Sequence, residues 1–124
     1  MPEVAVMMAA AMVSEARRLV MSGWCQDAHA RDRAGREVPS WSEEASSWSL
    51  LGALLASWHR HDALGIDEDV VAHLADAHAL GKATEAFGEV VGTASLERWN
   101  DDPRRTLDDV ISASERALLL LGED

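Results

Sequence analysis

Apolar residues recur at helical spacing along nearly the whole chain. In the first segment, Met12, Ala16 and Leu19 follow one another three or four residues apart, the spacing that places side chains on one face of an α-helix. Strand-like alternation is short wherever it occurs, and β-branched residues are sparse and scattered, which disfavours β-sheet. The pattern predicts an all-α fold, a compact bundle of about four to six helices with a short helical or irregular segment after the first helix.

The first predicted helix spans about Glu3 to Met21 and ends at Ser22-Gly23, because glycine commonly follows the last helical turn. Its first half is apolar on every side, so it requires cover from the core and from a second subunit. The sequence therefore predicts a homodimer that forms through the N-terminal helix. Since no linker or internal repeat interrupts the chain, we expect one helical domain over residues 1–124.

A second helix start is predicted where Ser40 and Glu43, three residues apart, match a capping box. The central, most buried helix is expected to begin there, after a short helical stretch over residues 24–34. A glycine in mid-helix costs about 1 kcal/mol relative to alanine, so Gly52 is expected where another helix approaches closely. One stripe of the predicted helix comprises Trp41, Ala45, Trp48, Gly52, Leu55 and His59.

Three further helices are predicted toward the C-terminus. Asp67 is the expected N-cap of one that Gly81 closes, and a short helix follows from Thr84 to Val91. The last helix is expected to begin near Thr106, where a weaker capping box starts, and to run to Gly122.

The chain carries 11 basic and 22 acidic residues, a formal net charge of −11. A protein that holds nucleic acid must neutralise phosphates with Lys and Arg, and an anionic membrane surface likewise attracts basic segments. We therefore expect neither nucleic acid nor a membrane as a partner.

A single cysteine, Cys25, excludes an internal disulfide and the paired-cysteine zinc sites. The apolar run from Val4 to Val13 has the composition of a signal-peptide core, but Glu3 precedes it where a basic residue is required. A run this short does not span a bilayer. These features predict a cytoplasmic protein, and ten arginines against one lysine are typical of a GC-rich bacterial genome.

Three blocks stand out by composition and order. They are a Trp-led segment over residues 24–35 that contains Ala-Arg-Asp and ends in glycine, residues 48–54 (Trp-Ser-Leu-Leu-Gly-Ala-Leu) and residues 99–106 (Trp-Asn-Asp-Asp-Pro-Arg-Arg-Thr). Together they resemble the domain of unknown function 6197 family of small bacterial proteins, in which a helix carries Trp-Cys-x-x-Gly-Ala-Leu and an Asn-Asp segment leads through Thr into the final helix. The resemblance covers about Val13 to Leu121. It implies a helical fold and a bacterial cytoplasmic setting, with no known activity.

Two departures from the family pattern matter. Ser49 stands where the family often has Cys, which argues against a mechanism that needs a thiol at that position. Residues 1–11 precede the resembling region, so they look like an apolar N-terminal extension of the first helix.

Ligand-binding candidates come from the polar residues beside tryptophans in these blocks. If the first block is helical, Trp24 and Arg31 share a face, where the indole is a flat apolar wall and the guanidinium suits a carboxylate or phosphate. Trp99 with Asn100 offers a similar wall, and Trp48 is a further candidate. The structural alternatives are that Arg31 pairs with a carboxylate to fix its loop, that Asn100 shapes the turn before the last helix, and that the tryptophans are core anchors.

Acid–base candidates are Asp32, His59 and Asp101. Asp62, three residues after His59, would orient the imidazole as a general base requires. The alternative is that His59, on an apolar stripe, is a core-edge histidine without a catalytic role.

Metal and cofactor sites are not expected. His59 and His61 lie two residues apart, about 200° around a helix, so they do not match the His-x-x-x-His spacing that brings two imidazoles together. Cys25 has His29 four residues on, a pair that lowers a thiol pKa if it forms. The alternative is that Cys25 is a small buried apolar side chain.

The sequence favours a non-enzymatic, self-associating module that binds a small molecule or a partner protein in a Trp-lined groove containing Arg31. The alternative is a small cofactor-independent enzyme, of hydrolase or isomerase type, in which Asp32, His59 or Asp101 is the acid or base and Arg31 holds an anion. The enzyme requires that these side chains share one cavity.

Overall fold

The computed structural model of the protein describes residues 4–65 and 70–122, without side-chain detail at residues 60–77. Within these ranges the chain forms five helices and one two-stranded sheet, so the predicted all-α bundle of four to six helices is confirmed. In chain order the elements are α1 (Val4–Ser22), β1 (Ala30–Arg31), β2 (Ser47–Trp48), α2 (Leu50–Gly65), α3 (Val70–Val91), α4 (Leu96–Asp101) and α5 (Leu107–Leu120).

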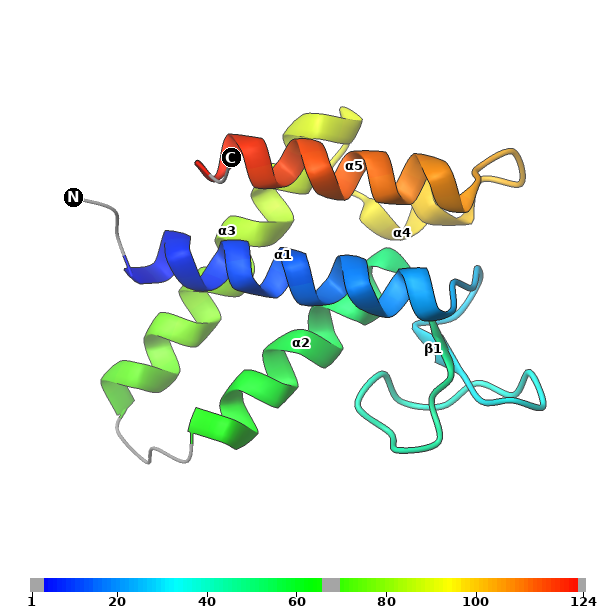
Figure 1. The fold of residues 1–124 in the computed structure, drawn as a ribbon, viewed down its shortest axis with the longest axis horizontal. Helices are drawn as coiled ribbons and strands as arrows, with labels where there is room; N and C mark the ends of the chain where they lie inside the picture. The colour runs from blue at the N-terminus through cyan, green and yellow to red at the C-terminus, as the bar shows by residue number, and fades with distance from the viewer. Residues whose placement is uncertain (1–3, 66–69, 123–124) are drawn as a thin grey trace.

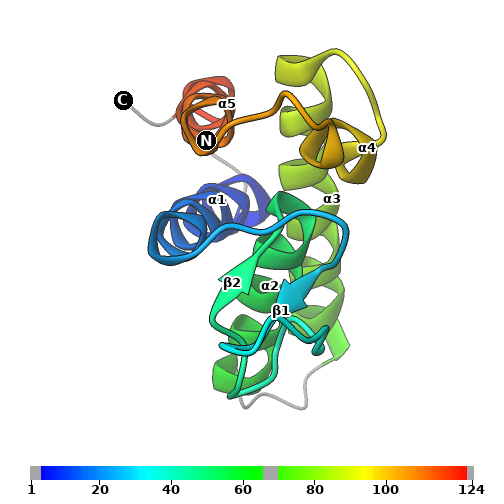
Figure 2. The same cartoon turned by 90° about the vertical axis from the view of Figure 1, so that its right-hand side faces the viewer.

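The first helix, α1, lies at the centre of the bundle and packs against α2, α3 and α5 (Figure 1). α5 runs antiparallel beside α1, and α3 spans one side of the bundle, where it contacts α2, α4 and α5 (Figure 2). This arrangement removes from water the apolar stripes that the sequence predicts. The largest fully buried side chains include Phe87, Met12, Leu50, Leu54 and Val13.

The bounds of α1 agree with the helix predicted from Glu3 to Met21. The buried face of α1 includes Ala9, Met12 and Val13, none of which is exposed, so much of the cover for its apolar first half comes from the chain's own helices. The opposite face leaves Met7 58% exposed and Met21 52% exposed.

The segment between α1 and α2 is an irregular loop closed by a short sheet. β1 and β2 pair antiparallel, with Ala30 opposite Trp48, and the Val38 amide donates to the Ala30 carbonyl at 3.1 Å. The helical stretch predicted over residues 24–34 is therefore wrong. Its backbone groups bond to residues far along the chain, and this tertiary pairing overrides a weak local helical preference.

The helix start predicted at Ser40 is also wrong, because α2 begins at Leu50. Ser49 caps that helix, since its hydroxyl accepts the Gly52 amide hydrogen at 3.0 Å. Ser40 lies in the loop, where its carbonyl accepts the indole N–H of Trp48 at 3.0 Å. A helix would place these two residues about 12 Å apart along its axis, so this bond excludes a helix that contains both.

Gly81 does not end a helix, contrary to the prediction, and α3 continues through it. Ala79 and Phe87 are fully buried on either side of Gly81 at helical spacing. Burying this stripe outweighs the cost of about 1 kcal/mol for one exposed glycine. Residues 84–91 are therefore the last turns of α3 rather than a separate helix, and Asp67, the predicted N-cap, lies outside the described residues.

The sequence predicts the start of α5 but not that of α4. α4 is a helix of six residues without a counterpart among the predicted elements, capped by Ser95, whose hydroxyl accepts the Arg98 amide at 3.4 Å. The predicted capping box of α5 is confirmed. Thr106 Oγ1 accepts the Asp109 amide at 3.2 Å, and Asp109 Oδ2 accepts the Thr106 amide at 3.0 Å.

Candidate functional site

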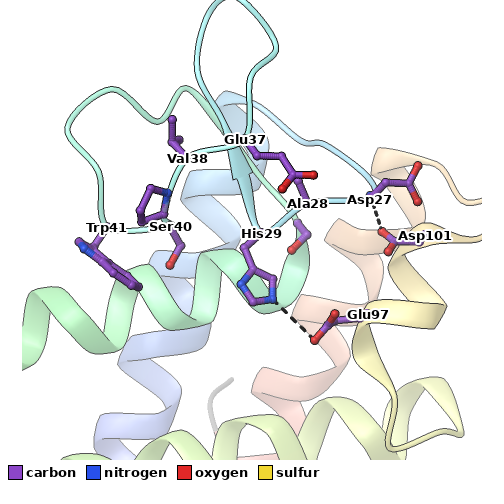
Figure 3. Close-up of a pocket in the computed structure, with 11 residues that line it drawn as sticks. Asp27, Ala28, His29, Glu37, Val38, Ser40, Trp41, Glu97 and Asp101 are labelled. Carbon is purple, nitrogen blue, oxygen red and sulfur yellow. Dashed lines mark hydrogen bonds and ion pairs between the residues drawn. The ribbon is translucent and has the colours of Figure 1, made fainter.

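An open pocket of about 580 Å³ lies between the loop that joins α1 to α2, the start of α2, and α4 (Figure 3). We call it the loop pocket. Its volume is in the range of small-molecule sites, about 300–1,000 Å³. The residues that line it are Asp27, Ala28, His29, Glu37, Val38, Pro39, Ser40, Trp41, Ser49, Glu97 and Asp101.

Asn100 fixes the position of α4 beside the loop pocket. Its fully buried side-chain oxygen accepts hydrogen bonds from Trp24 Nε1 at 2.8 Å and from the Leu50 amide at 3.0 Å. Its Nδ2 donates to the Cys25 carbonyl at 3.1 Å and to Asp101 Oδ1 at 3.0 Å. A primary amide offers two accepting and two donating sites, so Asn100 uses all four to join the loop, α2 and α4.

Further hydrogen bonds hold the loop against α4. Gln26 Nε2 donates to the Asn100 carbonyl at 2.9 Å and to the Asp102 carbonyl at 2.8 Å. Asp27 adopts a positive φ of 64°, which residues other than glycine seldom do. Its amide donates to Asp101 Oδ1 at 2.8 Å, and this bond places Asp27 and Asp101 together at one end of the pocket.

His29 lies near the centre of the loop pocket (Figure 3). Its carbonyl accepts the Ser49 amide hydrogen at 3.0 Å, and a Cβ added at Gly52 would lie only 1.8 Å from that carbonyl oxygen. A glycine is therefore required at position 52, as expected for a close approach, but the approaching group is loop backbone rather than the predicted helix. The imidazole Nε2 lies 3.6 Å from Glu97 Oε1 on α4.

Ser40 and Trp41 lie on the other side of the loop pocket. Ser40 is 3% exposed, and its hydroxyl has no hydrogen-bond partner within the part of the chain that the structure describes. Figure 3 shows that hydroxyl directed toward the space between Trp41 and His29. Trp41 is 57% exposed and stacks on His59, with ring centroids 5.4 Å apart.

The charged side chains of the loop pocket are acidic, apart from any charge on His29. Neither Arg nor Lys is among the lining residues. Over the described ranges, no group of three or more His, Cys, Asp or Glu side chains is arranged to hold a metal ion. The pocket therefore presents dispersed negative charge, from Asp27, Glu37, Glu97 and Asp101.

The residues predicted to bind a ligand have other contacts in the structure. Arg31 donates to the Gly35 carbonyl at 2.9 Å and the Gln26 carbonyl at 3.2 Å, so it fixes its loop through carbonyls rather than through the carboxylate considered from the sequence. The Trp99 ring faces the Arg105 guanidinium, 4.0 Å from the ring centroid. The lining of the loop pocket includes none of the five predicted residues, Trp24, Arg31, Trp48, Trp99 and Asn100.

Asp32 stabilises a tight turn in the loop. Its Oδ1 accepts the amides of Ala34 and Arg36, both at 2.9 Å, and its Oδ2 accepts Arg36 Nε at 3.2 Å. The backbone hydrogen bond from Arg36 is the main reason why the pKa of the Asp32 carboxyl is lowered. Asp32 lines a different and more open cavity, beside Trp48.

The other two acid–base candidates are also separated. Asp101 lines the loop pocket, where its Oδ1 accepts two hydrogen bonds. His59 is exposed on α2 and stacks on Trp41, and the side chain of Asp62, its expected partner, lies outside the described residues. Asp32, His59 and Asp101 therefore do not line one common cavity.

Cys25 has the environment of an inert thiol. Its Sγ lies 3.8 Å from the Ala28 carbonyl oxygen, and burial raises the pKa of the Cys25 thiol. A raised pKa lowers the fraction of reactive thiolate. Cys25 is partly buried, less than the small buried side chain expected from the sequence, and its raised pKa is that of an unreactive thiol.

Several pocket residues lie outside the candidates predicted from the sequence. Ser40 matches a capping box, and this local pattern predicts a helix start rather than a residue that lines a pocket. Glu37 and Glu97 belong to no motif, since acidic residues are common throughout this chain. A local signal exists for Asp27, Ala28 and His29, which lie within the first of the three distinctive blocks, and for Ser49, which lies within the second.

Comparison with known proteins identifies the family but no activity. Among the described helices, none is long and apolar enough to cross a membrane. No curated protein and no solved structure has a significant match to the chain. The sequence profile of DUF6197, a family of unknown function, matches residues 6–118. The matched range includes every residue of the loop pocket, and it begins within residues 1–11, which the sequence suggests are an N-terminal extension. The chain therefore belongs to the DUF6197 family of unknown function.

Proposed function

We propose that the protein is a non-enzymatic module that binds a small molecule in the loop pocket. The observation that carries this proposal is the buried Ser40 hydroxyl, which has no partner among the described residues and faces the pocket (Figure 3). Leaving a buried hydroxyl unpaired costs about 1–3 kcal/mol, and a ligand that pairs with it removes that cost. Trp41 adds a flat apolar surface beside it, and this combination of few polar groups with an aromatic wall is typical of small-molecule sites.

Binding is a better interpretation than catalysis because the proposed acid–base groups are dispersed. Asp32, His59 and Asp101 lie in three different environments, whereas a general acid–base mechanism needs its groups around one reacting atom. The imidazole of His29 and the carboxylate of Glu97 are 46% and 58% exposed, so water competes for both groups.

Ligand binding is tested by ligand-observed NMR with a fragment library that contains cationic, neutral and anionic compounds. Ala28 lines the loop pocket and Ala34 lines the other cavity, so Ala28→Trp fills the proposed site and Ala34→Trp is its matched control. Circular dichroism checks that both variants fold. We expect hits that Ala28→Trp abolishes and Ala34→Trp retains. A library without hits, or hits that Ala28→Trp leaves unchanged, contradicts the proposal.

We further propose that the protein self-associates through α1. Met7 and Met21 are the large apolar side chains on its exposed face, and methionine adapts well to partner surfaces. Sedimentation at micromolar concentration is expected to show a dimer. Met7→Glu should shift the protein toward monomer, and Ser112→Glu, at an exposed position on α5 and so outside the proposed interface, is the control for added charge. A strict monomer at these concentrations contradicts the proposal.

A further inference from the structure

We infer that the ligand of the loop pocket is an organic ammonium ion with an apolar body, an inference that rests on the proposed binding function. The two ends of the pocket differ in chemistry (Figure 3). Val38 and Trp41 lie toward one end, and Asp27 and Asp101 lie toward the other with Glu97 close by. A ligand that matches both ends has an apolar group at one side and a positive charge at the other.

The charge of the pocket selects a cation. Asp27, Glu37, Glu97 and Asp101 carry negative charge at neutral pH, and neither Lys nor Arg is among the lining residues to offset it. The guanidinium of Arg31 is engaged with backbone carbonyls. An anionic ligand would meet repulsion from all four carboxylates, whereas a cation is attracted by each of them.

The acceptors of the pocket match the donors of an ammonium group. Carboxylates only accept hydrogen bonds, and a hydroxyl can also accept them, while a primary ammonium offers three donors and no acceptor. The Ser40 hydroxyl supplies an acceptor away from the acidic end. The hydrogen bond from the Asp27 amide and the bond from Asn100 Nδ2 both go to Asp101 Oδ1 and hold that carboxylate in place. Part of the acidic end is therefore organised before any ligand arrives.

The dispersion of the carboxylates favours an organic cation over a metal ion. A hard divalent ion requires several oxygen ligands within about 2.6 Å of one point. In the described part of the chain no three candidate ligands converge in that way. The acidic groups surround a space of about 580 Å³, which suits a larger ion whose charge is shared among several carboxylates.

The aromatic wall accounts for the apolar part of the ligand. Trp41 is 57% exposed, and its stacking on His59 holds the indole at the edge of the pocket. Val38 and Pro39 extend this apolar surface. An indole accepts apolar groups by burial and cations by interaction with the ring face, so an arylalkylamine satisfies both ends of the pocket.

A matched trio of probes tests the inference by isothermal calorimetry: 2-phenylethylamine, 2-phenylethanol and 3-phenylpropanoate, which share a ring and differ in charge. We expect phenylethylamine to bind about tenfold or more tightly than phenylethanol, and phenylpropanoate to bind least. Raising the salt concentration to about 1 M, where the screening length is about 3 Å, should reduce this preference.

Variants localise the effect. Glu97→Gln should weaken the binding of phenylethylamine about threefold, as expected for one solvent-exposed charge, and leave the binding of phenylethanol unchanged. Glu44→Gln removes a charge from the other cavity and should change neither. Trp41→Ala should weaken the binding of both ligands, because it removes the apolar wall.

The outcomes separate this inference from the proposed function. If phenylethanol or phenylpropanoate binds as well as the amine, and Ala28→Trp abolishes that binding, the pocket binds ligands but the inferred charge class is wrong. If only neutral or anionic fragments of the library bind in the pocket, the inference is likewise overturned. If no compound of either set binds in the pocket, the proposed function fails as well.

Discussion

Replacing Asn100 by alanine tests whether this residue holds the pocket together. The substitution removes the partner of three groups: the indole N–H of Trp24, the amide of Leu50 and the carbonyl of Cys25. An unpaired buried polar group costs about 1–3 kcal/mol. Because Trp24 and Cys25 are only partly buried, water can reach them in part, and we expect a total loss of about 3–5 kcal/mol.

This loss is large for a domain whose free energy of unfolding is about 5–15 kcal/mol. Urea denaturation followed by circular dichroism measures it. With a denaturant slope of about 1.5–2 kcal/mol per M, Asn100→Ala should lower the midpoint by about 2 M. Ser14→Ala, on the exposed face of α1, is the control and should change the stability by no more than about 0.5 kcal/mol. A loss of less than about 1 kcal/mol for Asn100→Ala would refute the role of the four hydrogen bonds.

Three further predictions follow from other contacts. Gly52→Ala should destabilise the fold, because a Cβ there meets the His29 carbonyl. A Cβ at Gly81 meets nothing within 4 Å, so Gly81→Ala should stabilise α3 by up to about 1 kcal/mol. Equal effects of the two substitutions on the midpoint of urea denaturation would contradict this. Cys25 should react with iodoacetamide more slowly than a free thiol at pH 8, since burial raises its pKa, and as fast as one in denaturant. The lowered pKa of Asp32 stabilises the fold above the unfolded value of about 4, and this contribution is lost as the pH falls through the native pKa, so Asp32→Asn should flatten the acid limb of the stability profile.

The parts of the fold that the sequence predicts correctly are those with local causes. The α1 helix follows from its apolar spacing and the glycine after it, and the capping box of α5 needs only Thr106 and Asp109. Both signals lie within a few residues of the structure that they specify, so no distant contact was required. The prediction that Gly81 ends a helix is wrong because the local cost of one glycine, about 1 kcal/mol, is smaller than the gain in free energy from burying the residues on either side of it.

The loop pocket depends on contacts that the sequence does not display. Ser40 is held by Trp48, and Asn100 bonds to Trp24, which lies 76 positions earlier in the chain. The sequence points to the polar residues beside tryptophans as ligand-binding candidates, but Trp24 and Asn100 use their polar atoms to hold the loop against α2 and α4, and neither lines the pocket. The cytoplasmic location and the lack of a cofactor stay predictions from the sequence.

The sequence by itself determined the helical class, the first and last helices, the family and the acidic character of the protein, because periodicity, caps and charge are properties of neighbouring residues. Only the tertiary structure decided where the acidic residues gather. Asp27 and Glu37 come from the loop, and Glu97 and Asp101 come from α4. These two segments surround one pocket because Asn100 and Gly52 bring the loop against α4 and α2. The position of a site made by loop closure depends on hydrogen bonds between distant residues, and no local pattern in the chain encodes those bonds.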